Sequence, residues 1–237
     1  MLRAQFEEEL GKLHNQFYAM GNEVLAQINN AVRAFTTHDR ELAKEVIEAD
    51  KKINAFEVKL EKKSLEIIAL QQPVSTDLRR VITVLKATSD LERMGDHAVS
   101  VAKAAIRMKG EVRIPVVEEE IKKMGREVRQ LVEETLELYL GDADMERAYE
   151  VAARDEVVNE FYSTIQELTT EEIKKNPESL VAGRDYYQVL TYLERVGDYA
   201  KIFVSGLFIY AQVILQSCNS EVREGFFSTI CQVHQGI

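Results

Sequence analysis

Apolar residues recur at three- and four-residue spacing along nearly the whole chain, between runs of Ala, Leu, Glu, Lys, Gln and Arg. This spacing is typical of amphipathic α-helices, and the intervening residue types are good helix formers. Only three prolines and eleven glycines interrupt the pattern in 237 residues. The sequence therefore predicts an all-α protein built from six long helices.

Capping residues and prolines set the expected ends of the helices in the first half. The first helix is expected at residues 2–36, and the second begins after Asp39 as its N-cap and ends near Gln71. Pro73 is expected at the start of the third helix, because proline is favoured in the first helical turn, and this helix reaches about Lys109.

The second half repeats this plan after a linker at residues 109–115. Gly141-Asp142 is the expected turn between the fourth and fifth helices, and Asn176-Pro177 is the expected start of the sixth. Long helices joined by short turns pack against antiparallel neighbours, so we predict two tandem repeats of an up-down-up three-helix bundle. The matched positions are Met20 and Met124 (124 − 20 = 104), Asp50 and Asp155 (155 − 50 = 105), Pro73 and Pro177 (177 − 73 = 104), and Glu92 and Glu194 (194 − 92 = 102).

The two most similar segments of the halves are polar. Residues 90–98 and 192–200 share the skeleton Leu-Glu-Arg-x-Gly-Asp-x-Ala. At four residues' separation on a helix, the Glu and Asp of each copy project from one face. They are displaced by one residue from the apolar stripe, so we expect them at the edge of the packed face. The stripe residues are Val81, Val84, Thr88, Leu91, Gly95, Ala98 and Ala102 in the third helix, and Leu190, Leu193, Gly197, Ala200 and Val204 in the sixth.

The second and fifth helices carry a similar pattern. Their expected packing residues are Val46, Ala49, Ile53, Phe56 and Leu60 in the second helix, and Val151, Val158, Phe161 and Ile165 in the fifth. Side chains that carry an oxygen again lie one position away from these packing residues, and Glu57 and Glu61 lie further along the second helix. If the two edges face each other, each half holds a site for hard cations. The candidate metal ligands are Asp50, Asn54, Glu92 and Asp96 in the first half, and Asp155, Asn159, Glu194 and Asp198 in the second.

A cation would relieve the repulsion among clustered carboxylates, and acid oxygens accept Mg, Mn, Fe and, less readily, Zn. Two other interpretations stay open. The acids can be the solvated edge of an apolar stripe, or Arg93 and Arg195 can neutralise them as ion pairs. His97 is matched by Tyr199 and is interpreted as an ordinary edge histidine, so the pattern differs from the Glu-x-x-His signature of buried di-iron bundles.

Charge and composition exclude several classes. Thirty Lys and Arg against forty Asp and Glu give a formal net charge of −10, and the basic residues are scattered, which argues against nucleic acid as a partner. No apolar run is long enough to span a bilayer and no signal peptide is seen, so a cytoplasmic protein is expected. Cys218 and Cys231 both lie in the last twenty residues, so cysteine chemistry does not support the body of the fold.

Residues 92–98 and 194–200, together with Gln72-Pro73-Val74-Ser75-Thr76-Asp77-Leu78-Arg79, resemble the PhoU family of phosphate-transport regulators over about residues 1–201. The resemblance implies paired three-helix bundles whose surface Glu/Asp-x-x-x-Asp motifs hold iron or zinc clusters. It also implies a regulator that damps phosphate uptake and the phosphate-starvation response through the transporter's ATPase subunit and a membrane sensor histidine kinase. Asn54 and Asn159 depart from the motif, because Asn stands where Asp would complete it.

On this interpretation, residues 1–109 and 110–201 are the two repeats, and residues 202–237 are an atypical tail. The tail departs from the family pattern at Ile202, and a one-base shift of reading frame accounts for the difference; a divergent extension is the alternative. We expect a non-enzymatic protein, peripherally associated with a transporter and homodimeric. A carboxylate-bridged metalloenzyme, a metal-storage bundle and a purely structural helical scaffold are the alternatives.

Overall fold

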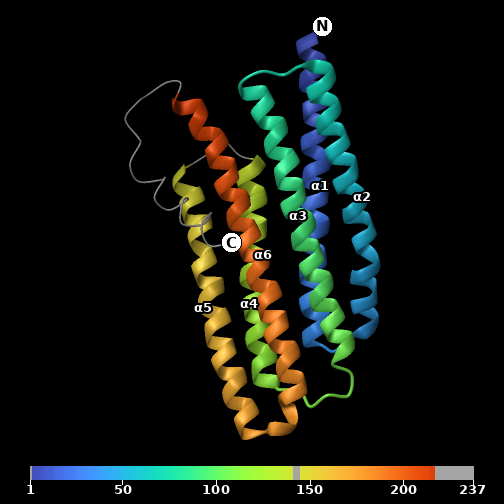
Figure 1. Cartoon of the computed structure of the whole chain (residues 1–237), viewed down its shortest axis with the longest axis vertical. Coiled ribbons are helices and arrows are strands. Elements are labelled where there is room, and N and C mark those ends of the chain that lie inside the picture. The colour runs from blue at the N-terminus through green and yellow to red at the C-terminus, as the bar shows by residue number, and fades with distance from the viewer. Residues whose placement is uncertain (1, 141–144, 217–237) are drawn as a thin grey trace.

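The computed structural model describes residues 2–140 and 145–216 of the chain. Within these residues all regular structure is helical, which confirms the predicted all-α class. Figure 1 shows the long helices side by side. Their bounds are α1 Leu2–Thr36, α2 Arg40–Gln71, α3 Thr76–Arg107, α4 Pro115–Leu140, α5 Met145–Lys175 and α6 Leu180–Gln216, with a short 3-10 turn η1, Pro177–Ser179, before α6.

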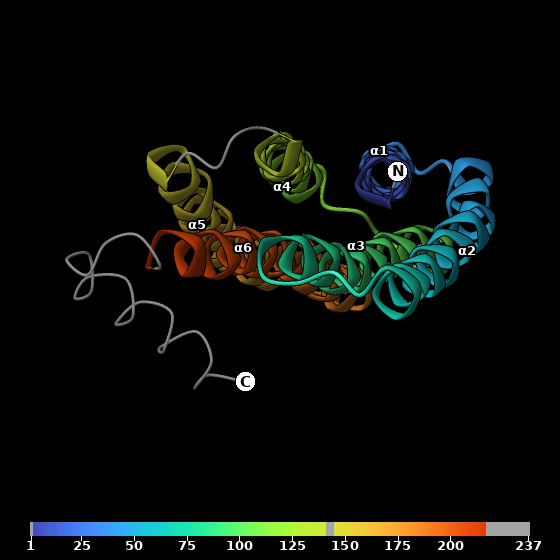
Figure 2. The same ribbon diagram turned by 90° about the horizontal axis from the view of Figure 1, so that it is seen from above.

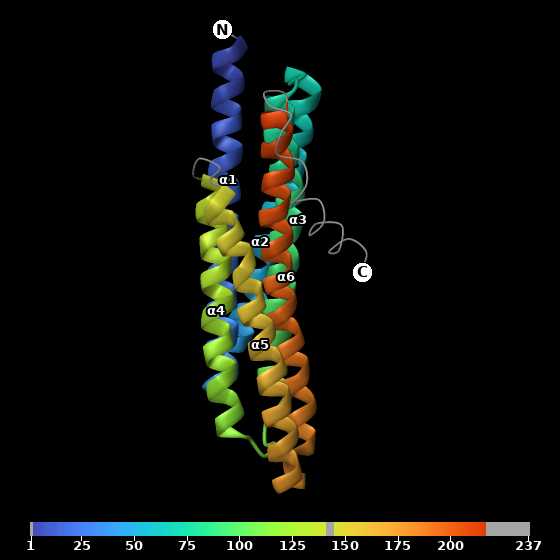
Figure 3. The same cartoon turned by 90° about the vertical axis from the view of Figure 1, so that its left-hand side faces the viewer.

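The helices form two layers (Figure 2). The first is a curved layer in the order α2, α3, α6, α5, and α1 and α4 form the second layer on one of its faces. Figures 1 and 3 show that α3 and α6 run antiparallel, as do α1 and α4. Each half is therefore an up-down-up bundle of three helices, as predicted, and the halves join along α1–α4 and α3–α6.

Two matched glycines bring α1 and α4 close together. A Cβ atom added to Gly21 would lie 2.6 Å from Leu136 Cδ2, and one added to Gly125 would lie 2.7 Å from Val32 Cγ1. Gly21 and Gly125 occupy the same position of the two repeats, so the same crossing is made twice. The missing side chains let the helices approach, and apolar side chains of the partner helix fill the space.

The packing stripes predicted for the third and sixth helices are buried throughout, which confirms the helical register. In the second helix the prediction was wrong at Ala49, which is exposed, whereas Asp50 is half-buried. The buried stripe of α2 runs through Asp50, because α2 packs against both α1 and α3 and Asp50 contacts Gln27 of α1. In α2 and α5, Phe56 and Phe161 lie at the edge of the core and are only half-buried.

Caps decide where two of the elements begin. Asp39 precedes α2, and its Oδ1 accepts a hydrogen bond from the Leu42 amide at 3.0 Å. Asn176 caps η1, because its Oδ1 accepts from the Glu178 amide at 3.3 Å. The third helix begins at Thr76, three residues after the expected Pro73, because Ser75 has a positive φ of 51° that a helix does not accept.

The C-terminal part of α6 continues smoothly across residue 202 as far as Gln216. The expected turn at Gly141-Asp142 and both cysteines lie outside the described residues. Among the described helices, none combines the length and the apolar character needed to cross a bilayer.

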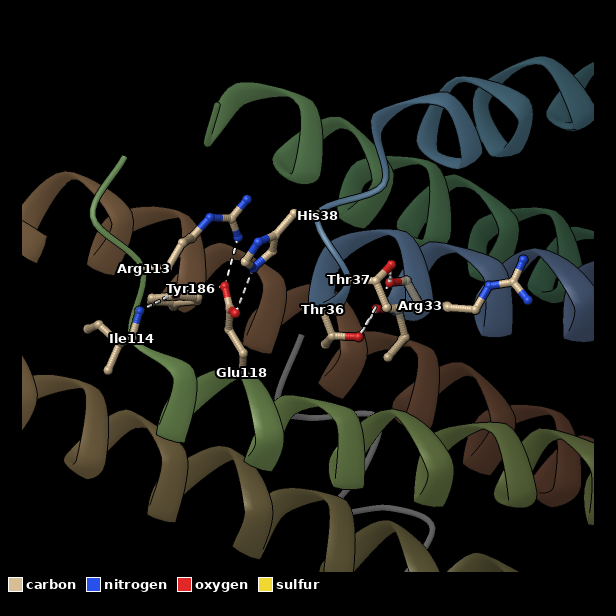
Figure 4. Close-up of polar contacts among 9 residues, drawn as sticks. Arg33, Thr36, Thr37, His38, Arg113, Ile114, Glu118 and Tyr186 are labelled. Atoms are coloured by element: carbon tan, nitrogen blue, oxygen red, sulfur yellow. Dashed lines mark hydrogen bonds and ion pairs between the residues drawn. The ribbon is translucent and has the colours of Figure 1, made fainter. Parts of the chain in front are cut away.

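A buried polar network joins the two halves at the end of the molecule where α1 turns into α2 (Figure 4). The Glu118 carboxylate of α4 accepts hydrogen bonds from Arg113 Nη1 at 2.8 Å, His38 Nε2 at 2.8 Å and the Tyr186 hydroxyl at 2.9 Å. The Tyr186 oxygen in turn accepts from the Ile114 amide at 2.9 Å. One carboxylate therefore ties together the α1–α2 turn, the linker before α4, and α6.

Candidate functional site

The first acidic cluster lies between α2 and α3 and contains Asp50, Glu57, Glu92 and Asp96. Asp50 Oδ1 accepts a hydrogen bond from Gln27 Nε2 of α1 at 3.2 Å. Its Oδ2 accepts from the Nδ2 atom of Asn54, one turn further along α2, at 3.1 Å. Asp50 is therefore held by two neutral amides, and no ion pair with it is found among the described residues.

Carboxylates of the two helices lie close enough to raise each other's pKa values. Burial raises the pKa of Glu92, and the negative charges of Asp96 and Glu57 raise it further. Burial also raises the pKa of Asp96, and the charge of Asp50 on the neighbouring helix adds to this. The mutual repulsion is the condition that a bound cation would relieve.

The second acidic cluster lies between α5 and α6 and contains Asp155, Glu194 and Asp198. Asp155 is only 1% exposed, more deeply buried than the edge position expected from its sequence. Its Oδ2 accepts from Lys201 Nζ at 2.9 Å and from Asn159 Nδ2 at 3.3 Å. Its Oδ1 is buried and has no hydrogen-bond partner among the described residues. An unsatisfied buried carboxylate oxygen is costly, and this one lies against the backbone of Gly197 in α6.

Glu194 and Asp198 show the same repulsion as their counterparts in the first half. Burial raises the pKa of Glu194, followed by the charges of Asp198 and Asp155. Burial raises the pKa of Asp198, followed by the charge of Asp155. The acids of α5 and α6 therefore lie close enough for their charges to act on one another.

The two clusters differ in the groups that support the α2 or α5 aspartate. Gln27 contacts Asp50 in the first half, whereas the matched position in the second half is Leu131 (131 − 27 = 104). Lys201 neutralises part of the charge of Asp155, whereas the matched position in the first half is Val99 (201 − 99 = 102). The first cluster consequently keeps more of its negative charge. Neither partner follows from the Glu-x-x-x-Asp pattern, because both come from outside it.

The predicted ligands thus lie together in each half, but their donor atoms are not gathered. Within the described residues, no three His, Cys, Asp or Glu side chains are arranged to hold one metal ion. Asn54 and Asn159 are exposed, and each turns its amide nitrogen toward the neighbouring aspartate. The carboxylate oxygens suit hard cations, but holding one requires side-chain rotation, and metal binding stays a prediction.

Aromatic and basic side chains fill the seam between the two acidic clusters. His97 stacks on Tyr192 and Tyr199, with ring centroids 5.8 and 5.7 Å apart. Burial, together with the charges of Arg195 and Arg93, lowers the pKa of His97 to about 4, so His97 is neutral at pH 7. Arg93 donates to the Tyr199 hydroxyl at 3.4 Å. Among the described residues, neither arginine forms a direct ion pair with an acid, but the charge of Arg93 lowers the pKa of Glu92 and Asp96, and that of Arg195 lowers the pKa of Glu194 and Asp198. The two arginines therefore offset part of the charge of the clusters from a distance.

Asp90, at the start of the segment 90–98, gives a prediction on stability. Burial raises its pKa to about 6. Because the folded pKa lies above the unfolded value, the contribution of Asp90 to stability is fully present below about pH 4 and is lost as the pH rises through about 6. We expect Asp90→Asn to raise the free energy of unfolding at pH 7 by about 1–2 kcal/mol, with no gain at pH 4, measured by urea denaturation.

The control for this prediction is Asp39→Asn, because Asn and Asp are equally good N-caps and this variant should change little at either pH. A gain for Asp90→Asn that is the same at pH 4 and pH 7 would contradict the assignment to the buried carboxylate.

Comparison with known families gives one clear match. The model of the PhoU domain matches residues 17–105 and again residues 121–204, one copy in each half. A protein of Clostridium acetobutylicum named phosphate-specific transport system accessory protein PhoU homolog is 35% identical over 199 residues, covering 84% of this chain and 90% of that protein. The accessory protein PhoU of Escherichia coli K12 is 29% identical over 211 residues, covering 89% and 87% of the two chains.

Solved structures agree with this match. The crystal structure of PhoU from Pseudomonas aeruginosa superposes with a TM-score of 0.82 at 31% sequence identity, and covers 87% of this chain and 99% of that chain. The phosphate transport system regulatory protein PhoU from Streptococcus pneumoniae superposes with a TM-score of 0.79 at 29% identity, covering 87% and 96%. The likeness therefore extends over both repeats.

Proposed function

Because this chain belongs to the PhoU family, we propose that it is a negative regulator of phosphate uptake that acts on a phosphate-specific ABC transporter. A regulatory role in phosphate transport is supported by the relatives, which are named accessory or regulatory proteins of that system. The observation that carries the proposal is the match of both halves of the chain to the PhoU domain, in the same tandem arrangement as the solved structures.

The proposed mechanism is that of an adaptor, which changes the activity of its partners by binding them. The proposed partners are the ATPase subunit of the transporter and a membrane sensor histidine kinase, and the association with the membrane is peripheral. The long helices support this role, because they form a broad, continuous surface on the α2–α3–α6–α5 layer (Figure 2).

The seam between the acidic clusters is the part of this layer that we assign to partner contact. Arg93 is exposed and lies 5.8 Å from the centre of the Tyr199 ring, beside the half-buried Tyr192. Arginine and tyrosine are enriched among the residues that dominate protein–protein binding energy. The flanking acids would add charge selectivity to such a contact.

We further propose that each acidic cluster binds a hard cation, with iron or zinc as the candidates from the family and Mg or Mn as alternatives. Asp50, Glu92 and Asp96 would hold it in the first half, and Asp155, Glu194 and Asp198 in the second. The raised pKa values of Glu92, Asp96, Glu194 and Asp198 and the unpartnered Asp155 Oδ1 support the proposal. A cation would neutralise the repulsion and fix α2 against α3, and α5 against α6.

The experiment is affinity capture of transporter complexes from membranes by the tagged full chain, at high and low phosphate. We expect the wild-type chain to capture the ATPase subunit at one of the two phosphate levels. With Arg93→Ala/Tyr199→Ala, the amount of ATPase captured should fall by at least about tenfold, because truncating two central contacts removes a few kcal/mol. The matched control is Tyr18→Ala/Arg129→Ala on the α1–α4 layer, which should capture as the wild type does. Equal capture by all three proteins would contradict the assigned surface, and no capture of the ATPase would contradict the adaptor mechanism.

A further inference from the structure

A basic cavity lies on the outer side of the α1–α4 layer, away from both acidic clusters. It has a volume of about 240 Å³ and opens where Val32 packs against Gly125. Its walls are one stripe of α1 with the start of the following turn, and one stripe of α4. The lining residues are Asn29, Val32, Arg33, Thr36, Thr37, Lys122, Gly125 and Arg126.

Three of these side chains are cationic and none is acidic. Arg33 and Arg126 form no ion pair or side-chain hydrogen bond with any other described residue. Lys122 reaches Glu119 at 3.4 Å, but both side chains are about half exposed, so this pair contributes little. In a chain of net charge −10, two cations without an acidic partner and a third that is only weakly paired are a local exception around one cavity.

The nearest buried acid does not supply the missing charge. Glu118 begins the same helix, but its oxygens are engaged by Arg113, His38 and Tyr186. Figure 4 shows the Glu118 carboxylate turned toward that network, while Arg33 extends from α1 in the opposite direction, beyond Thr36 and Thr37. The cations of the cavity are therefore left for another anion.

The internal duplication provides a comparison within the molecule. The same α1–α4 crossing recurs at Gly21 and Leu136, and the positions that are basic in the cavity are acidic or neutral there. At this second crossing the acids Glu133 and Glu137 form ion pairs with Arg129 and Arg147. Since the crossing forms without the cations, the fold does not require them. The matched positions are Asn29 and Glu133, Arg33 and Glu137, Lys122 and Tyr18, and Arg126 and Asn22.

We propose that this cavity binds a small, doubly charged oxyanion, a phosphate group. Two guanidinium groups and one ammonium group can neutralise its charge, and guanidinium can donate two parallel hydrogen bonds to neighbouring oxygens. The Asn29 amide adds a neutral donor. Thr36 and Thr37 line the cavity without serving as donors, because their hydroxyls already donate to the Val32 and Arg33 carbonyls at 2.9 and 2.8 Å. The site goes beyond the proposed regulatory function and is tested independently of it.

The test is calorimetric titration of the full-length chain with inorganic phosphate and, separately, with ATP, at constant ionic strength set with chloride. We expect saturable binding that weakens at least about tenfold in Arg33→Gln/Arg126→Gln, because the charge-assisted contacts are lost. The control is Arg129→Gln/Arg147→Gln, which removes two positive charges near the duplicate crossing and should stay within about twofold of wild type. Thermal unfolding checks that all three proteins are folded.

Both ligands carry a phosphate group, and their relative affinities show whether the cavity prefers the free ion or a nucleotide. Tighter binding of inorganic phosphate points to the free ion, and tighter binding of ATP points to a nucleotide. The proposal is overturned if neither ligand gives a saturable signal above chloride, or if the two arginine pairs have the same effect. Either of these failures leaves the capture of the transporter ATPase, and with it the proposed function, unaffected.

Discussion

Glu118→Ala is expected to lower the free energy of unfolding by about 3–5 kcal/mol, the range for removing one partner of a buried ion pair. The Glu118 side chain is only 8% exposed and accepts hydrogen bonds from Arg113, His38 and Tyr186. Without the carboxylate, the Arg113 guanidinium, itself 14% exposed, is left with an unpaired charge in a largely apolar setting. Urea denaturation measures the change.

Because the network joins three segments of chain, its loss should also loosen the end of the molecule where α1 meets α2. Hydrogen exchange is expected to accelerate first at residues 36–42 and 108–118. The control is Glu119→Ala, at the next position, whose side chain is 55% exposed and pairs only with Lys122 among the described residues. This control should cost less than about 0.5 kcal/mol. Equal losses in the two variants would show that the network does not hold the halves together.

The second large effect is expected on metal binding, when the acids of α3 and α6 are neutralised together. The variant is Glu92→Gln/Asp96→Asn/Glu194→Gln/Asp198→Asn. The affinity for Mn²⁺, Fe²⁺ or Zn²⁺ should fall by at least about a hundredfold, because these carboxylates supply most of the ligand charge. Metal content after purification without chelator, and titration of the apoprotein, measure this effect.

The same variant should also change the thermal stability of the metal-free protein. The pKa values of all four acids are raised in the folded protein, first by burial and then by neighbouring acids. Their contribution to stability is therefore present at low pH and is lost as the pH rises through the folded pKa values. We expect the metal-free variant to have a higher Tm than the metal-free wild type at pH 7. Added metal should raise the Tm of the wild type only.

A matched control neutralises four acids elsewhere, in Glu41→Gln/Glu48→Gln/Glu119→Gln/Glu156→Gln. These side chains are exposed, so the control changes net charge by the same amount without touching either cluster. It should bind metal as the wild type does. A wild type without saturable metal binding, or a control that loses as much affinity as the test variant, would contradict the metal proposal.

Most of the fold follows from local sequence features. The period of the apolar residues, the Asp39 cap and the scarcity of Gly and Pro predict the helices, and the duplication predicts the paired bundles. The start of α3 could not be placed from Pro73 alone, because the positive φ of Ser75 depends on how the chain turns between α2 and α3. Ala49 and Asp50 are both compatible with a core position after Val46, because a three-residue step and a four-residue step are equally helical. The packing of α2 against α1 and α3 decides between them.

The candidate site was only partly predictable, for a similar reason. The Glu-x-x-x-Asp spacing places two acids on one side of α3 and of α6. The packing of α2 and α5 against these helices adds Asp50 and Asp155 to the clusters. Asp50 and Asp155 are contacted by Gln27 of α1 and Lys201 of α6, respectively. These contacts depend on the tertiary packing of the helices and could not be predicted from the spacing. The Glu118 network likewise joins residues 38, 113, 118 and 186, which share no sequence pattern. The metal, the homodimer and the boundaries at residues 109 and 201 stay predictions.

Complementation tests the central claim most directly. The chain is expressed in a bacterium that lacks its own PhoU, and phosphate uptake is measured together with a reporter of the phosphate-starvation response in phosphate-rich medium. The expected result is slower uptake and a repressed reporter, with repression lost in the Arg93→Ala/Tyr199→Ala variant. Unrestrained uptake and an active reporter, in cells that contain the folded wild-type chain, would contradict its role as a negative regulator of phosphate transport.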